Sequence, residues 1–148
     1  MRRKSEGAAA SQSRRRRTAR PNGPPDSRTG RDRIAAGRIY DDPRPDDGAR
    51  VLVMRLWPRG VRKDRVTLWL RELGPEAPLM RSFLRGDTSW EEYSRRYLGG
   101  LGRPEAQAAL DDVRRLARSG PVTLLCWCAD EQRCHRSLLR NYLARHVV

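Results

Sequence analysis

The chain has 148 residues, with 32 basic and 18 acidic side chains and a formal net charge of +14, and its length favours one domain. No stretch approaches the ~20 consecutive apolar residues that a membrane span needs. Three cysteines, an odd number, do not make the disulfide framework of a small secreted protein, so we expect a cytoplasmic protein without membrane contact.

Residues 1–38 differ in composition from the rest of the chain. They hold eleven Arg and one Lys against three acidic residues, and Ile34 is their single large aliphatic side chain beyond Met1. Such a segment buries too little apolar surface to offset its backbone entropy, which predicts disorder. We place a disordered Arg-rich tail at residues 1–33 and the folded domain at residues 34–148. The arginines at 14–17 leave nucleic-acid binding through the tail open, although the excess of Arg over Lys extends along the whole chain.

The first strong element of the folded part is the apolar run Val51 to Met54. A strand that is apolar on both faces is typical of a parallel sheet flanked by helices. The run ends in the motif RLWPRG, residues 55–60, where Pro58 and Gly60 predict a tight exit from the strand.

Five segments carry the apolar spacing of amphipathic helices. They are Val66 to Leu73, Leu79 to Leu84, Trp90 to Leu101, Ala106 to Ala117 and Leu138 to Leu143. The Ser89–Glu92 pattern is a capping box for the third of them. Before the last one, residues 122–127 (VTLLCW) read as a second buried strand. The expected fold class is therefore α/β: a small, mostly parallel sheet flanked by helices in one compact domain.

All three cysteines and one of the two histidines lie between Cys126 and His135. Cys126, Cys128, Cys134 and His135 are ligands of the type that zinc prefers. In a regular strand, however, Cys126 and Cys128 have Cα atoms ~6.6 Å apart, whereas two thiolates on one zinc lie within ~4.6 Å. These four residues are therefore weak metal candidates, and no cofactor is expected.

A reactive thiol is the alternative that we favour for this segment. Cys134 lies near the first turn of a helix that follows a strand, with Arg133, His135 and Arg136 as neighbours. Free backbone N–H groups and positive charge lower a thiol pKa. Cys126, inside the strand, is expected to be an inert core residue. The remaining alternative makes Cys134 a small hydrophobic residue beneath the helix.

Four arginines follow the two predicted strands and indicate an anion site. Arg55 and Arg59 follow the first strand in the chain. Arg133 and Arg136 stand on either side of the start of the helix that follows the second strand. In open parallel sheets, ligands bind outside the carboxyl ends of the strands. If these strands are neighbours, the arginines meet His135 in one crevice that suits an anion. Trp57, Pro58 and Gly60 are expected to frame that crevice. The alternative is a set of exposed arginines.

The motifs RLWPRGVRK (55–63) and CHRSLL (134–139), together with LWLRELGPE, WEEY and VTLLC, give the chain a family resemblance. Over about residues 39–143 it resembles the YeaO-like family, domain of unknown function 488. The resemblance implies a compact, cytoplasmic, bacterial α/β protein and supplies no reaction. Family members usually have Asp where this chain has Met54, so any role of that carboxylate does not apply here.

These features lead to one functional hypothesis and two alternatives. The hypothesis is an enzyme that acts on an anionic small molecule, phosphorylated or nucleotide-like. The four arginines would bind its charge, His135 would act as acid and base, and Cys134 would be a thiolate nucleophile or redox group. The alternatives are a non-catalytic protein that binds nucleic acid through the tail and crevice, and a Cys/His metal or redox sensor. The oligomeric state is left open.

Overall fold

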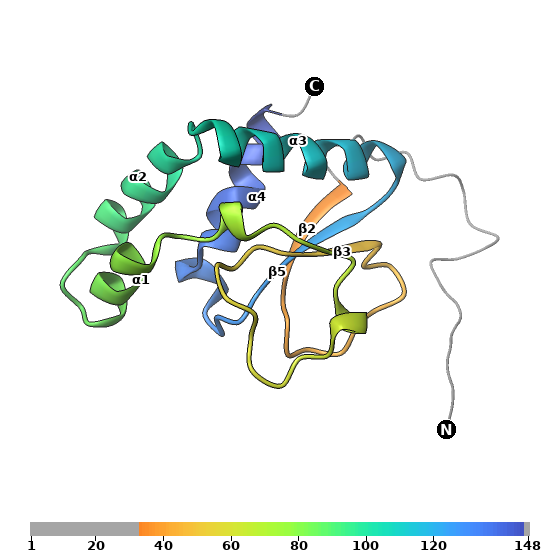
Figure 1. Ribbon diagram of the computed structural model, residues 1–148, viewed down its shortest axis with the longest axis horizontal. Helices are drawn as coiled ribbons and strands as arrows, with labels where there is room; N and C mark the ends of the chain where they lie inside the picture. The colour runs from red at the N-terminus through yellow and green to blue at the C-terminus, as the bar shows by residue number, and fades with distance from the viewer. Residues whose placement is uncertain (1–32, 147–148) are drawn as a thin grey trace.

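The computed structural model describes residues 33–146, so the predicted tail lies outside the described residues except for Arg33. Four parallel strands form one sheet (Figure 1). Their order is β2 (Ile34–Arg38), β5 (Val122–Cys126), β3 (Ala49–Leu52) and β4 (Leu68–Trp69). The predicted α/β class with a parallel sheet is confirmed, and the two apolar runs are neighbouring strands.

Strand β2 lies within the domain placed at residues 34–148, but it corrects the expectation from composition that residues 34–38 are disordered. Its five residues pair in register with the whole of β5, from Ile34 opposite Val122 to Arg38 opposite Cys126. Composition is misleading for this strand because strand pairing depends on backbone hydrogen bonds and does not need large side chains. Small residues at 35–37 are compatible with this position at the edge of the sheet.

Four of the five predicted helices are present. They are α1 (Ala77–Leu84), α2 (Trp90–Gly100), α3 (Pro104–Ser119) and α4 (His135–His146). The cap predicted for α2 forms, because the Ser89 hydroxyl accepts a hydrogen bond from the Glu92 amide at 3.1 Å. No helix within residues 33–146 is long and apolar enough to cross a membrane.

The helix predicted over residues 66–73 is wrong. The segment contains β4 between two short 3-10 helices, η2 (Lys63–Arg65) and η3 (Arg71–Leu73). Strand β4 pairs with β3, and the Leu70 amide donates to the Leu52 carbonyl at 2.9 Å. Hydrogen bonds to a neighbouring strand therefore override a helical apolar spacing in this segment.

The two faces of the sheet are covered differently. Buried apolar residues of all four α-helices share one core with Val51, Val122 and Leu124. On the other face, Leu52 and Leu125 pack under the connection that follows β3, which includes Trp57, Val61 and Val66. Trp57 donates to the Val61 carbonyl at 2.7 Å and meets Trp69 edge to face. The RLWPRG motif thus contributes Trp57 to the cover of the face that has no α-helices.

Candidate functional site

The candidate site lies where the two central strands end. Because β3 and β5 are parallel neighbours, their carboxyl ends meet at one edge of the sheet. Val53 follows β3, Cys126 is the last residue of β5, and α4 begins at His135. Cys134 immediately precedes α4, as predicted. Backbone hydrogen bonding between the strands and packing of α4 against them bring these residues together.

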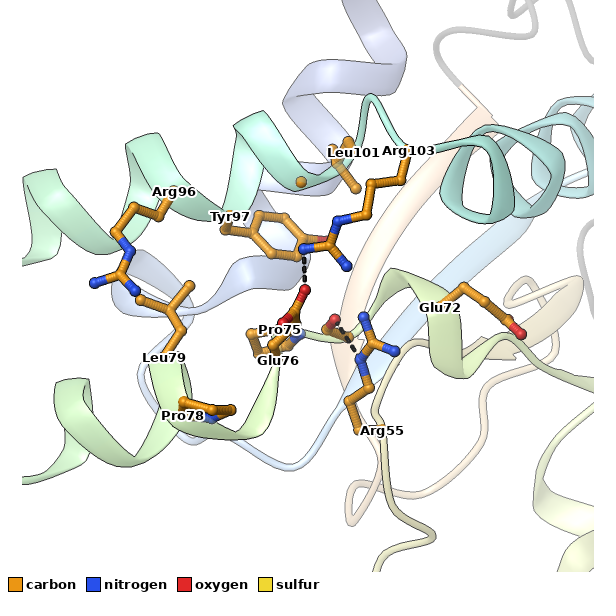
Figure 2. Close-up of a pocket in the computed structure, with 12 residues that line it drawn as sticks. Arg55, Glu72, Pro75, Glu76, Pro78, Leu79, Arg96, Tyr97, Leu101 and Arg103 are labelled. Atoms are coloured by element: carbon orange, nitrogen blue, oxygen red, sulfur yellow. Dashed lines mark hydrogen bonds and ion pairs between the residues drawn. The ribbon is translucent and has the colours of Figure 1, made fainter.

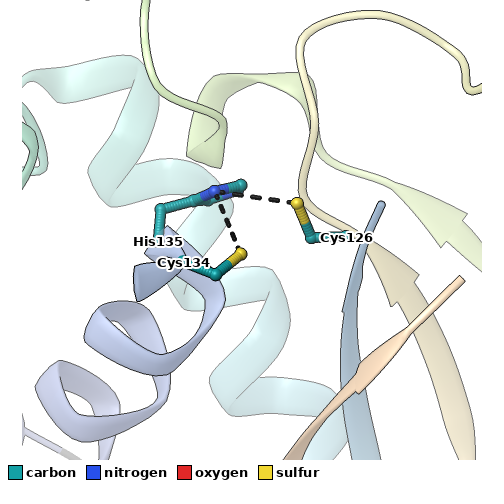
Figure 3. Close-up of side chains that lie close together, drawn as sticks. All are labelled: Cys126, Cys134 and His135. Atoms are coloured by element: carbon teal, nitrogen blue, oxygen red, sulfur yellow. Dashed lines mark hydrogen bonds between the residues drawn. The ribbon is translucent and has the colours of Figure 1, made fainter. Parts of the chain in front are cut away.

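His135 is the centre of the cluster and is 1% exposed. Its Nε2 lies 2.5 Å from the Val53 carbonyl oxygen, so Nε2 must carry the hydrogen and donate it. Nδ1 of the neutral ring is then an acceptor. It lies 3.8 Å from the sulfur of Cys126 and 3.8 Å from that of Cys134 (Figure 3). The fold therefore fixes the imidazole tautomer and presents its free nitrogen to two thiols.

Cys126 does not have the isolated position that the sequence suggested. It is fully buried, but the strand ends at this residue instead of continuing through Trp127. The chain turns after it, and the Cys126 and Cys128 sulfurs lie 3.6 Å apart. Cys126 and Cys128 therefore do not share a regular strand, and the expected Cα separation of ~6.6 Å does not apply to them.

Arg136 places a positive charge inside the cluster. The residue is 3% exposed, its Nη1 donates to the Cys128 carbonyl at 2.7 Å, and Nη1 lies 3.7 Å from the Cys134 sulfur. Its buried Nε has no hydrogen-bond partner. A buried guanidinium needs a compensating anion or acceptor. A thiolate at Cys134 is the acceptor that its geometry favours.

The three thiols differ in acidity because they share hydrogen bonds. Hydrogen bonds from Cys126 and Cys128 hold the pKa of Cys134 well below its ordinary value, despite burial. The pKa of Cys126 is raised far above the ordinary value by its hydrogen bonds with Cys128 and Cys134 and by burial. The pKa of Cys128 is about 11, since the hydrogen bond with Cys126 lowers it less than Cys134 and burial raise it. A single negative charge on Cys134, with the thiols of Cys126 and Cys128 donating hydrogen bonds to it, accounts for the direction of all three pKa shifts.

A cavity of about 250 Å³ adjoins the cluster, with His135 in its wall. Its charged groups are Arg55 and Arg81, and its remaining lining is apolar: Met54, Leu56, Pro75, Ala77, Met80 and Trp127. A second cavity, of about 130 Å³, shares Arg55 and Pro75 with the first. Figure 2 shows Arg96 and Arg103 beside this second cavity, with Arg103 paired to Glu76. Arg55 donates to the Gly74 carbonyl at 3.1 Å at the boundary of the two cavities.

The structure brings together only part of the predicted site. Cys134, His135 and Arg136 are in contact, and Arg55 lines the cavity that His135 borders. Arg59 and Arg133 are exposed and line neither cavity. Trp57, Pro58 and Gly60 also lie outside the lining of both cavities. Anion binding by the two exposed arginines stays a prediction, as does the framing role of residues 57–60.

Several site features were missed by the sequence reasoning. The Val53 carbonyl is a backbone group, which no side-chain pattern marks. Arg81 lies on α1 without any distinguishing motif. Cys126 had a usable signal, because it occupies the carboxyl end of a buried central strand, where parallel sheets place their ligands.

Tyr97 supports the cluster from α2, and its hydroxyl offers a clean test. The ring packs edge to face on His135 at 5.4 Å, and the buried hydroxyl donates to the Leu73 carbonyl at 2.7 Å. Tyr97→Phe is expected to reduce the free energy of unfolding in urea by about 1–3 kcal/mol, because the carbonyl is left buried and unpaired. The matched control is Tyr40→Phe. The Tyr40 hydroxyl donates to the Arg59 carbonyl at 2.9 Å in an exposed position, so water can replace it in the variant. Equal losses in the two variants would contradict this role.

Comparison with known proteins places these features in a family context. A family model described as the active DUF488-N3 subclade matches residues 34–147. The uncharacterized protein Rv3073c of Mycobacterium tuberculosis is 34% identical over 113 residues, covering 75% of this chain and 93% of that protein. The uncharacterized protein YeaO of Escherichia coli K12 is 32% identical over 113 residues, covering 74% of this chain and 96% of that protein. No solved structure matches the chain.

Proposed function

Because the chain belongs to the YeaO-like DUF488 family, in a subclade described as active, we propose that it is a thiol-dependent enzyme acting on an anionic small molecule. The observation that carries this proposal is the position of His135. Its ring is fixed by Val53, directs its free nitrogen at Cys134, and borders a cavity that contains two arginines. A nucleophile, a base beside it and a group that orients the base are the parts of nucleophilic catalysis.

The proposed chemistry assigns one role to each of three residues. His135 Nδ1 accepts the thiol proton of Cys134, and the imidazolium and Arg136 stabilise the thiolate. The thiolate attacks an electrophilic atom of the substrate, so that a bond to sulfur forms and the bond to the leaving group breaks. His135 returns the proton to the leaving group, and water then cleaves the thio-intermediate. Since Cys134 is 1% exposed, reaction at its sulfur requires local opening.

The cavity also supports a class of substrate. Arg55 and Arg81 favour a phosphate or carboxylate, and the surrounding apolar side chains favour a flat or apolar body. A nucleotide-like molecule has both parts. Met54 lines the cavity with an uncharged side chain, so it does not repel an anion from this wall.

Two further parts of the proposal concern location and nucleic acid. The three cysteines are free, and a reducing compartment keeps thiols in that state, which supports the cytoplasm. Nucleic-acid binding through residues 1–33 remains the alternative from the sequence, and that segment lies outside the described residues.

Two alkylating agents of similar size and different charge test the proposal. Iodoacetate is an anion and iodoacetamide is neutral, so the ratio of their rate constants at Cys134 reports attraction of anions. We expect this ratio to exceed that of free glutathione by roughly three- to tenfold, which corresponds to about 1 kcal/mol. The rates come from mass spectrometry of tryptic peptides after timed labelling of the chelator-treated protein.

Variants connect that ratio to the cavity. Arg55→Met should lower it towards the glutathione value, because the charge at the cavity wall is lost. Arg115→Met is the matched control, since Arg115 lies on α3, paired with Asp112 and away from both cavities. A wild-type ratio equal to that of glutathione would contradict anion recognition at this site.

A further inference from the structure

We propose that Cys126, Cys128, Cys134 and His135 form a binding site for a thiophilic divalent metal ion of the Zn²⁺ type. The ligand atoms of Cys126, Cys134 and His135 all lie within 4.8 Å of one another, and all three residues are buried. Cys128 adds a sulfur 3.6 Å from that of Cys126. Three cysteines and one histidine are a common ligand set of closed zinc sites.

The distances agree with tetrahedral coordination. Bonds of about 2.3 Å to sulfur and about 2.0 Å to nitrogen give edges of roughly 3.8 Å between sulfurs and roughly 3.5 Å between sulfur and nitrogen. The structure has one sulfur–sulfur distance of 3.6 Å and two sulfur–nitrogen distances of 3.8 Å. Shifts of a few tenths of an ångström on these edges bring Cys126, Cys134 and His135 onto one ion, whereas Cys128, which lies outside the 4.8 Å group, must move further to serve as the fourth ligand.

The groups around the ligands also have the arrangement of a metal site. A histidine that binds metal through one nitrogen usually donates its other N–H to a carbonyl or carboxylate, and His135 donates Nε2–H to Val53. A divalent ion with three thiolates and a neutral imidazole carries one net negative charge. The buried guanidinium of Arg136, with an unpartnered Nε, lies beside Cys134 and supplies the balancing positive charge.

Metal binding at this position acts on the proposed enzyme as an inhibitor. Loading replaces the protons of Cys126 and Cys128, and the lone pair of Cys134 that would attack a substrate is donated to the metal. The metal-free protein is the reactive form, and the metal-loaded protein is the inactive form. This regulatory step rests on the proposed function, whereas the binding site itself rests on the geometry alone.

Co²⁺ is the spectroscopic probe for the site. The reduced, chelator-treated full chain is titrated with Co²⁺ and then with Zn²⁺. We expect one equivalent of Co²⁺ to give a thiolate-to-cobalt charge-transfer band and the intense visible absorption of tetrahedral cobalt. Zn²⁺ should abolish both signals. A weak octahedral spectrum without charge transfer in the wild-type protein would overturn the proposal without recourse to any variant.

Substitutions then identify the ligands. Cys126→Ser, Cys134→Ser and His135→Gln should each weaken Co²⁺ binding by more than about 100-fold, since even loss of an outer partner costs about 10–100-fold. His146→Gln is the control, because the chain's other histidine is eleven residues further along α4, about 16 Å away. Full retention of the charge-transfer band in Cys134→Ser would overturn the assignment.

Labelling with iodoacetate separates this inference from the proposed function. One equivalent of Zn²⁺ should slow alkylation of Cys134 at least tenfold relative to protein in chelator. Unchanged labelling in Zn²⁺ overturns the metal site and leaves the enzyme proposal standing. Tight Co²⁺ binding, combined with a metal-free protein whose Cys134 shows no preference for iodoacetate, overturns the enzyme proposal and supports the metal site.

Discussion

Gly48→Ala is expected to destabilise the domain by about 2–5 kcal/mol, the sum of backbone strain and overpacking. Gly48 has a φ of +67°, which an L-residue adopts unfavourably. An added Cβ would overlap the Pro121 carbonyl oxygen and lie 2.6 Å from its carbon. That oxygen also accepts from the Ala49 amide at 2.9 Å and aligns the starts of β3 and β5. The strands that carry the site would therefore be forced apart.

A second glycine separates the two causes of this loss. Gly60 has a φ of +77°, but nothing lies within 4 Å of the Cβ that a substitution would add. Gly60→Ala should cost only about 1–2 kcal/mol for the backbone conformation. Urea unfolding of both variants gives the comparison. Similar losses in the two would show that the contact with Pro121 is easily relieved.

The alkylation rate of Cys134 is expected to stay nearly constant between pH 9 and pH 6. Its pKa is lowered, chiefly by the hydrogen bond from Cys126, so the thiolate persists as the pH falls. A free thiol with a pKa of ~8.5 loses roughly 200-fold in thiolate over the same interval. Burial slows the absolute rate at Cys134 but does not change the shape of the profile, which is the quantity to compare.

The other cysteines supply internal controls for this profile. Cys128, with a pKa of about 11, should label about tenfold faster with each pH unit up to that value. Cys126→Ala removes a hydrogen-bond donor to the Cys134 thiolate and should raise the pKa of Cys134. The alkylation rate of Cys134 should then begin to fall at a higher pH. Cys126→Ser keeps a hydrogen-bond donor and should shift that pH by a smaller amount. Chelator must be present throughout. A Cys134 profile that follows the free-thiol curve would show that the sulfur is protonated at pH 7.

Local signals explain which parts of the fold were predictable. The strands at Val51 and Val122 and the helix cap at Ser89 depend on neighbouring residues in the chain, and the sequence therefore indicated them. Strand β4 depends on its pairing with β3, so its helical spacing was misleading. The small residues of β2 gave no apolar signal because β5 supplies most of what holds that strand in place.

The same distinction applies to the site. Cys134 and His135 were identified because they stand together where a helix was expected to begin. The contact between Cys126 and His135 depends on the end of a strand and the start of a distant helix, and no spacing rule contains it. Arg136 and Arg59 belong to equally conspicuous motifs, yet only the tertiary structure distinguishes the buried one from the exposed one.

The central place of β5 has a consequence for how the protein is made. β2 and β3 do not pair with each other, because β5 lies between them. During synthesis both strands leave the ribosome long before residues 122–126 do, and the edges that face β5 stay open until then. The sheet and the thiol cluster thus form only after nearly the whole chain has emerged, in a late, long-range step that favours slow folding. Termination before β5 would leave β2 without a partner strand and β3 paired only with the two-residue strand β4.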